Sequence, residues 1–276
     1  MGNIVGEDMP VPAEISGELK DLSAGTHHTF LVRPEGSTLV AGVVKSADGY
    51  QGHMGLGPIK SLEDCDDSQS EFCEATEGGG TNFLPISVVV DIDGDEVDAP
   101  PFQRAYAGVG ASFDSDVMHS VLISKGGKVF ITGSNSNYQL CLGEEYDNTD
   151  FVVDFHEVPG ITNAAAAAVG EEFTLIMTDD GDVYGCGSNT NGQIGLGSDI
   201  EFSNTPTLIE GMGFIDNMSA GLSFSLFLDS ASGSMWMTGS NSYGQQCFFD
   251  EGNPTMGATE VRSCASRSKL ERGMYR

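Results

Sequence analysis

The chain has 276 residues, of which 37 are glycine; this length suits one large domain or two ordinary ones, and the glycines favour turns over long helices. Asp and Glu number 41 against 12 Lys and Arg, which gives a formal net charge of −29 at pH 7. A field of this sign repels phosphate backbones and anionic membrane surfaces. Between Lys128 and Arg262 there is no Lys or Arg, so no basic stripe can form there. Nucleic acid and membranes are therefore excluded as expected partners.

The six cysteines are irregularly spaced, in contrast to a secreted disulfide scaffold, and they contain no C-x-x-C metal motif. They are Cys65, Cys73, Cys141, Cys186, Cys247 and Cys264. We expect free thiols in a reducing compartment. No charged-then-apolar leader opens the chain, and no apolar run approaches the ~20 residues that span a bilayer. The expected location is the cytoplasm, with the nucleus as the alternative.

A glycine-rich motif occurs three times along the chain. It reads GSNSNYQLCLG at 133–143, GSNTNGQIGLG at 187–197 and GSNSYGQQCFF at 239–249. Each copy follows two apolar strands joined by a short turn, which is a β-hairpin pattern, and each hairpin follows a strand of small residues that ends in glycine. Because Asn and Gly tolerate positive φ, the motif can make successive tight turns. Units of about 50 residues built from short strands and turns predict the blades of a β-propeller.

A weaker fourth copy precedes these three. It consists of LSAGTHHTFLV from Leu22, TLVAG from Thr38 and GHMGLG at 52–57. Four units are therefore present. The alanine run at 164–168 favours a helix by propensity, but it occupies the small-residue strand of its unit. We predict a strand there, where neighbouring strands approach closely.

Together these patterns resemble the regulator of chromosome condensation repeat. The resemblance rests on an A-G-x-x-H-[ST] strand, a G-x-V-[YF]-x-x-G hairpin and a G-x-N-x-x-G-Q-[LI]-G-L-G motif, and it covers 19–57 and 101–249. It implies an all-β fold, a β-propeller with four-stranded blades, of which known members usually have seven. Four recognisable blades imply an incomplete or unusually small ring.

The repeats divide the chain into segments. These are the end of a possible preceding repeat (1–18), repeat 1 (19–57), an acidic insertion (58–100), repeat 2 (101–160), repeat 3 (161–212), repeat 4 (213–253) and a tail outside the pattern (254–276). Insertions in repeat proteins map to loops on one face, often the binding face. The run PISVVV in the insertion is a candidate strand of a projecting hairpin.

The family histidine appears as His28 and His119, whereas Phe173 and Phe224 stand at its place in the third and fourth units. Phenylalanine cannot replace a metal ligand or a general base, so we expect a structural role for the histidine. The first glycine and the asparagine of each glycine-rich motif are assigned the same role. These residues are Gly133, Asn135, Gly187, Asn189, Gly239 and Asn241.

Two further columns of the repeat bear on function. Trp236 is assigned to the aromatic position of the second hairpin strand, with Cys186 matched to it in the third unit. One tryptophan cannot form the tryptophan cluster on which plant ultraviolet photoreceptors of this fold rely. Cys141 and Cys247 share a column that holds Gly55 and Gly195 in the other units, which predicts tight packing there rather than redox chemistry.

The insertion contains Asp91, Asp93 and Asp95, which alternate as in the first half of a calcium loop. The glycine and the distal glutamate of that loop are misplaced, so we expect a solvated acidic loop, with a calcium site as the alternative. No Ser-His-Asp elbow, P-loop or H-E-x-x-H motif occurs. We therefore assign no catalytic residue and no cofactor.

The leading functional hypothesis is a non-enzymatic protein-protein interaction module, an acidic propeller scaffold that binds a basic protein. The alternative, implied by the resemblance, is a guanine-nucleotide exchange factor for a Ran-like small GTPase. Exchange acts by differential binding of a partner's states and needs no acid-base residue. A hydrolase with a calcium-supported site in the insertion is the third hypothesis.

Overall fold

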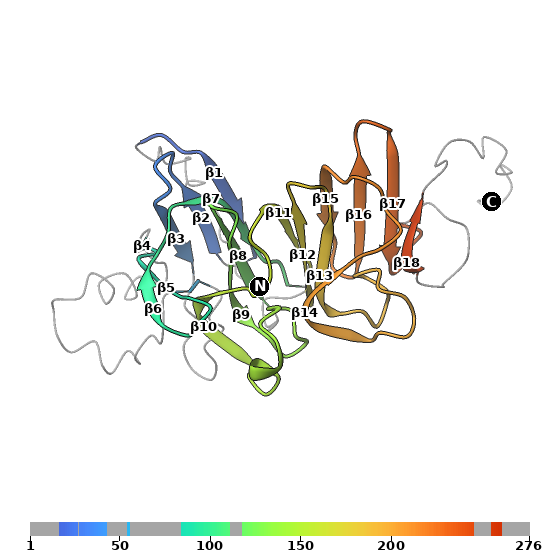
Figure 1. The fold of residues 1–276 in the computed structure, drawn as a ribbon, viewed down its shortest axis with the longest axis horizontal. Helices are drawn as coiled ribbons and strands as arrows, with labels where there is room; N and C mark the ends of the chain where they lie inside the picture. The colour runs from blue at the N-terminus through green and yellow to red at the C-terminus, as the bar shows by residue number, and fades with distance from the viewer. Residues whose placement is uncertain are drawn as a thin grey trace, which may run out of the picture.

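The computed structural model describes residues 17–26, 28–42, 54–55, 84–110, 118–245 and 255–260. In this part of the chain the only helix is the short 3-10 helix η2 (Glu144–Tyr146), and the strands form four β-sheets. The sheets follow one another in chain order across the molecule (Figure 1). The predicted all-β class and the four blades are confirmed.

Blades 1, 3 and 4 are four-stranded antiparallel sheets in which consecutive strands are neighbours. Blade 1 contains β1 (Asp21–Ala24), β2 (His28–Val32), β3 (Thr38–Gly42) and β4 (Leu84–Pro85). Blade 3 contains β11 (Ala164–Val169), β12 (Phe173–Thr178), β13 (Val183–Ser188) and β14 (Phe202–Leu208). Blade 4 contains β15 (Asn217–Ala220), β16 (Phe224–Asp229), β17 (Ser234–Gly239) and β18 (Thr255–Glu260). The alanine run is thus a strand, as its place in the repeat predicted.

Blade 2 has six strands because the insertion adds two of them. Its blade strands are β7 (Phe102–Ala107), β8 (His119–Ser124), β9 (Val129–Ser134) and β10 (Phe151–Glu157). The added hairpin consists of β5 (Val88–Val90) and β6 (Glu96–Asp98). It lies along the outer edge of the blade, where β5 pairs in parallel with β10 through Val90 and His156. The predicted hairpin exists, but it extends the sheet instead of projecting from it.

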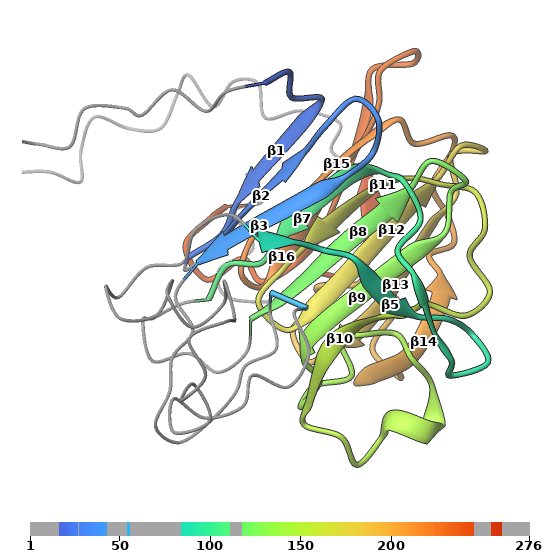
Figure 2. The same cartoon turned by 90° about the vertical axis from the view of Figure 1, so that its left-hand side faces the viewer.

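Successive blades contact one another through their innermost strands. Strand β7 contacts β1 and β2 of blade 1, β11 contacts β7 and β8 of blade 2, and β15 contacts β11. Blades 1 and 4 lie at opposite ends of this series, with blades 2 and 3 between them (Figure 1), and Figure 2 shows the same sheets from the side of blade 1. The described residues therefore form an arc of a propeller.

The hydrophobic core lies between the blades. Three clusters of buried side chains fill the spaces between successive blades. The central strands β8 and β12 are buried along their whole length because a blade covers each of their faces. In β16 of blade 4 only every second residue is buried over its first four positions. Ile86 and Val89 of the insertion belong to the cluster between blades 1 and 2, so this part of the insertion is integral to the fold.

The outermost strands depart from the sequence-based division of the chain. Strand β4 lies in the segment assigned to the insertion, and β18 lies in the segment assigned to the tail. An outer strand pairs through its backbone along one edge and needs none of the repeat's characteristic residues, so no motif marks it. The predictions for residues 1–16, 56–83 and 261–276, which include Cys65, Cys73 and Cys264, concern residues outside the described part of the chain, as does the prediction for Cys247.

The strand register corrects the assignment of the aromatic column. Phe173 pairs with Gly187 and Phe224 with Gly239, so counting back along β13 and β17 places Tyr184 at the position of Trp236. Cys186 corresponds to Thr238 instead. Tyr184 therefore fills the aromatic position of blade 3. The assignment of this position to Cys186 was wrong by two residues.

Candidate protein-interaction surface

Each blade has two ends, and the turns between its second and third strands lie at one of them. In all four blades these turns lie on the same face of the arc. These turns comprise residues 33–37, 125–128, 179–182 and 230–233, the last of which directly follows Asp229 at the end of β16. Because β5 runs parallel to β10, the turn that follows it at 91–95 lies at the same end. The linkers 158–163 and 209–216 also lie there, since each connects an outer strand to the next blade. We call this set of residues the turn surface.

Hydrogen bonds tie the turns of blades 1 and 2 together. The ammonium group of Lys125 donates to the carbonyl oxygens of Pro34 and Glu35, both at 2.9 Å. The amide of Phe102 donates to the carbonyl oxygen of Gly36 at 2.9 Å. These bonds fix the position of one turn relative to the next.

Similar bonds continue through blades 3 and 4. The side-chain amide of Asn163 donates to Asp179 Oδ1 at 2.7 Å and to Asp180 Oδ2 at 3.0 Å. In blade 4 the hydroxyl of Ser230 donates to Asp216 Oδ1 at 2.8 Å. Sequence reasoning missed Lys125 and Asn163, and no repeated residue type marks either position. Backbone hydrogen bonds from Ala164 to Gly127 and from Ile215 to Gly181 complete the connection of the turns into one platform.

The turn surface is predominantly acidic. Its carboxylates are Glu35, Asp91, Asp93, Asp95, Asp179, Asp180, Asp182, Glu210, Asp216 and Asp229. Hydrogen bonds from Ser37 and Ser232 lower the pKa values of Glu35 and Asp229 respectively, so both groups stay ionised at neutral pH. The cations on this surface are Arg33, Lys125 and Lys128 in blades 1 and 2, and Lys128 forms an ion pair with Glu157 at 2.9 Å. The part formed by blades 3 and 4 carries only negative charge.

The three aspartates considered as calcium ligands lie in the turn between β5 and β6. Asp91 Oδ1 accepts hydrogen bonds from the amides of Asp93 and Asp95, both at 3.0 Å, so this oxygen caps the turn. Asp93 and Asp95 are exposed. Among the residues that the structure describes, no three His, Cys, Asp or Glu side chains are grouped so that they could hold a metal ion. The three aspartates form no such group there.

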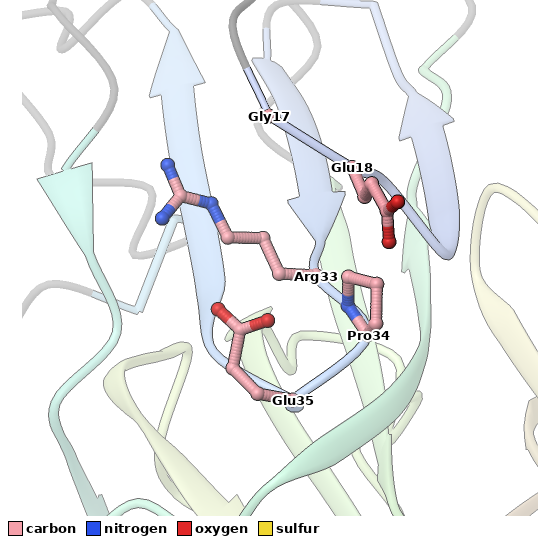
Figure 3. Close-up of a pocket in the computed structure, with 5 residues that line it drawn as sticks. All are labelled: Gly17, Glu18, Arg33, Pro34 and Glu35. Carbon is pink, nitrogen blue, oxygen red and sulfur yellow. The ribbon is translucent and has the colours of Figure 1, made fainter.

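A cavity of about 360 Å³ lies at the blade 1 edge of the turn surface (Figure 3). It is lined by Gly17, Glu18, Arg33, Pro34 and Glu35. The lining offers two carboxylates and one guanidinium group, and it contains no pair of nucleophile and base of the kind that acyl or phosphoryl transfer uses. Its groups suit ionic contacts with a partner's side chains.

The glycine-rich motifs lie at the opposite end of the blades. The first glycine of each motif has φ between +102° and +112°, and a Cβ there would come within 2.5 Å of the carbonyl oxygen of the residue just before the neighbouring strand. Gly133, Gly187 and Gly239 share this geometry. Only glycine fits these three positions without displacing the adjacent backbone.

The asparagine of the motif binds its own loop. Asn189 Nδ2 donates to the carbonyl oxygens of Gly197 and Ile200, and Asn189 Oδ1 accepts from the amides of Ile194 and Gly195, at 2.7 to 3.2 Å. Asn135 makes the corresponding bonds to Tyr146 and Leu140. Asn241 is likewise buried. These residues hold the motif loops in shape.

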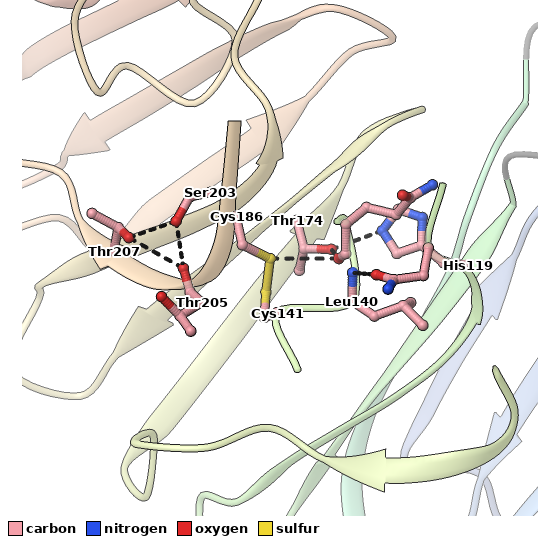
Figure 4. The surroundings of a disulfide bond; sticks show 10 residues. His119, Leu140, Cys141, Thr174, Cys186, Ser203, Thr205 and Thr207 are labelled. Atoms are coloured by element: carbon pink, nitrogen blue, oxygen red, sulfur yellow. Dashed lines mark hydrogen bonds between the residues drawn. A yellow bond between two sulfur atoms is a disulfide. The ribbon is translucent and has the colours of Figure 1, made fainter. Parts of the chain in front are cut away.

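The two family histidines lie inside the joints between blades. His28 Nε2 is 2.7 Å from Ser120 Oγ, and His119 Nε2 is 2.7 Å from Thr174 Oγ1. Thr174 in turn donates to the carbonyl oxygen of Gln139 at 2.7 Å (Figure 4). Both histidines are buried. Neither histidine lies on the turn surface. Their structural role stays a prediction, which measurements of the stability of variants can test.

A disulfide between Cys141 and Cys186 crosses the joint between blades 2 and 3 (Figure 4). The expectation of free thiols is therefore wrong for this pair. The two residues are 45 positions apart in sequence and belong to different units. The two cysteines occupy different positions of the repeat in successive units. No pattern in the sequence indicates that these two positions contact each other between blades.

Comparisons with known proteins agree with this architecture. Models of the regulator of chromosome condensation (RCC1) repeat match residues 180–228, and 165–193 together with 215–245. Protein RCC2 of Mus musculus is 34% identical over 130 residues, which is 46% of this chain and 24% of that protein. A secretion-regulating guanine nucleotide exchange factor of Bos taurus is 36% identical over 80 residues, which is 28% of this chain and 16% of that protein.

Solved structures extend the similarity to the fold as a whole. Prp20p from Saccharomyces cerevisiae superposes with a TM-score of 0.68 at 18% identity, over 92% of this chain and 52% of that one. The chain thus spans about half of that propeller and a quarter or less of the curated relatives. None of the described helical residues forms a segment long and apolar enough to cross a membrane. The chain therefore contains repeats of the RCC1 type between residues 165 and 245, and its fold is that of an RCC1 propeller.

Proposed function

We propose that this chain is a non-enzymatic protein-interaction module whose turn surface binds a basic protein. The observation that carries the proposal is the connected row of carboxylates on this surface, which has no Lys or Arg in blades 3 and 4. A propeller presents turns from several blades as one rigid surface, and complementary charge then raises the rate and specificity of association.

The relatives support a role in protein interaction or in the regulation of GTPases. The Prp20p structure was described together with the binding of that protein to Gsp1p and histones. Histones contact DNA phosphates through arginine side chains, so their surfaces are basic. A basic partner of this kind would complement the turn surface of the present chain.

The position of the acidic surface can be tested with two matched triple variants. Asp179→Asn/Asp180→Asn/Asp182→Asn removes three charges from the turn surface of blade 3. Glu144→Gln/Glu145→Gln/Asp147→Asn removes three charges from η2, at the opposite end of blade 2. Both variants have the same net charge, so they separate a local surface from the overall field of the protein.

The measurement is the Kd for purified core histones at low and high salt. At about 0.5 kcal/mol for each exposed charge, the blade 3 variant should bind roughly tenfold more weakly at low salt. The η2 variant should change the Kd by less than about threefold, and added salt should reduce the difference between the variants. Equal weakening by both variants, or by neither, would contradict binding at the turn surface.

The second candidate function is guanine-nucleotide exchange on a small GTPase. The similarity to a secretion-regulating guanine nucleotide exchange factor favours it. Exchange requires a partner surface that stabilises one nucleotide state over another, and it needs no catalytic acid or base. The test is the release of labelled guanine nucleotide from a purified Ran-like GTPase with and without this protein. An unchanged release rate would remove this candidate and leave the interaction proposal standing.

A further inference from the structure

The Cys141–Cys186 disulfide adds a covalent bond to a joint that the repeat otherwise builds without one. Cys141 lies in the glycine-rich motif that follows β9, and Cys186 lies in β13 of the next blade. Their Cα atoms are 5.4 Å apart, and the two residues are 1% and 0% exposed. The bond therefore links blades 2 and 3 from within their shared core.

The next joint, between blades 3 and 4, has Gly195 and Thr238 at the same two repeat positions. A Cβ on Gly195 would lie 3.3 Å from Thr238 Cγ2 and 3.4 Å from Thr238 Oγ1. The hydroxyl of Thr238 donates a hydrogen bond to the carbonyl oxygen of Gly192. The fold thus brings these two positions into contact at both joints, and one of the joints is packed and hydrogen-bonded with no sulfur present.

Cys186 has a hydrogen-bond partner for a reduced state as well. Cys186 Sγ lies 3.5 Å from the carbonyl oxygen of Gln139 (Figure 4). A Cys186 thiol at this position can donate to that oxygen, as the Thr238 hydroxyl does to Gly192 in the next joint. The hydrogen bond from Thr174 to Gln139 holds the joint in either state. Breaking the disulfide therefore leaves a joint of the kind already present between blades 3 and 4.

We propose that Cys141 and Cys186 form a redox-controlled clamp between blades 2 and 3. When it is oxidised, the joint is fixed covalently; when it is reduced, the joint is held by packing and hydrogen bonds alone and opens more readily. The proposal rests on the geometry of the two joints and is independent of the proposed binding function.

The exchange partner is a low-molecular-weight disulfide such as oxidised glutathione. One protein thiolate attacks a sulfur of that disulfide, releases one reduced molecule and forms a mixed disulfide. The second protein thiol then displaces the other molecule, so the protein loses two electrons and two protons while the small disulfide becomes two thiols. Since both cysteines are buried, exchange requires the joint to open locally.

The first experiment equilibrates the full chain in glutathione buffers and maps the Cys141–Cys186 cross-link by mass spectrometry. The thermal midpoint and amide hydrogen exchange of the joint are measured in parallel. We expect reversible loss of the cross-link in reducing buffer, together with faster exchange in β13 and in the motif that follows β9. A loop of this length predicts a melting temperature lower by about 8 °C or more after reduction.

The matched variant is Cys141→Gly/Cys186→Thr, which copies the residues of the next joint and should therefore fold. It should melt close to the reduced wild-type protein and show no change of midpoint with redox buffer. A cross-link that persists in about 10 mM reduced glutathione would make the bond permanent and overturn redox control. Equal midpoints and equal hydrogen exchange in the oxidised and reduced wild-type protein would overturn the clamp itself.

Discussion

Blades 2 and 3 follow the same repeat, yet they differ in three features. Blade 2 has the added hairpin β5–β6 and the ring of His119, whereas blade 3 has four strands and Phe173. The motif loop of blade 2 carries Cys141, and that of blade 3 carries Gly195. Both loops nevertheless accept a hydroxyl hydrogen bond from the next blade, from Thr174 to Gln139 O and from Ser225 to Gln193 O.

One part of the joint is common to both blades, and one part differs. The hydroxyl-to-carbonyl bond is present at both joints, while the buried ring beside it is an imidazole in one and a phenyl group in the other. We therefore expect the ring to fill space and the hydroxyl to satisfy a carbonyl oxygen that would otherwise be buried without a partner. Four predictions test the differences and similarities between the two blades, ordered by the expected effect of the first substitution in each.

The largest effect is expected at the motif asparagines. Asn189→Ala removes four hydrogen bonds inside the loop of blade 3, and we expect it to lower the free energy of unfolding by about 3 kcal/mol. Asn135→Ala removes two such bonds in blade 2 and should cost about 2 kcal/mol. Urea unfolding monitored by circular dichroism measures both. If the two costs proved equal, the loops would not differ as the hydrogen bonds indicate.

The joint hydroxyls should come next. Thr174→Val keeps the size of the side chain but removes the bonds to His119 and Gln139, and we expect a loss of about 2 kcal/mol. Ser225→Ala removes one bond, to Gln193, and should cost about 1 kcal/mol. The same unfolding experiment applies. A negligible cost for Thr174→Val would contradict a structural role for the hydroxyl.

Exchange of the ring tests the predicted structural role of the histidine. His119→Phe gives the blade 2 joint the ring of the blade 3 joint, and it should cost only about 1 kcal/mol, for the lost bond to Thr174. His119→Ala leaves a cavity and should cost about 3 kcal/mol. Binding to the partner should be unchanged in the phenylalanine variant, measured as Kd at equal folded concentration. Loss of binding with retained stability would assign His119 a functional role.

The smallest effect concerns His156 on β10, beside the hairpin that only blade 2 has. Burial lowers the pKa of His156, whose Nδ1 lies 2.9 Å from the hydroxyl of Tyr146. The unfolded chain therefore binds this proton more tightly than the folded one, and stability falls as the pH drops through the ordinary value of about 6.5.

The measurement is the difference in stability between the wild type and His156→Phe across this pH range. Burial and the nearby Glu96 raise the pKa of Asp154, an effect of opposite sign, but it is common to both proteins. The variant should lose less stability on acidification than the wild type. Parallel pH profiles would show that His156 does not contribute.

Much of the fold was predictable because the turns of the repeat require particular residue types at fixed positions. Gly187 and Asn189 recur at fixed positions since one must adopt positive φ against a neighbouring strand and the other must bind its own loop. The paired apolar strands between such turns then predict hairpins and blades. The alanine run shows the same logic, because its place in the unit outweighed its helical propensity.

The outer strands and the candidate site were less predictable. Strand β18 pairs through its backbone and carries no repeat residue, so it was assigned to the tail. The acidic character of the surface was visible in the composition, but the connection of its turns, for example by Lys125, depends on contacts between blades. Such contacts leave no periodic signal along the chain.

The blade type, the number of recognisable blades and the negative charge can be derived from the sequence alone, because these depend on local turn chemistry and composition. Contacts between distant segments place the insertion hairpin on the edge of blade 2 and bring Cys141 to Cys186. In both cases the edge or loop of one blade contacts a segment that is distant in sequence. The repeat pattern specifies contacts within one blade, so it does not predict these contacts.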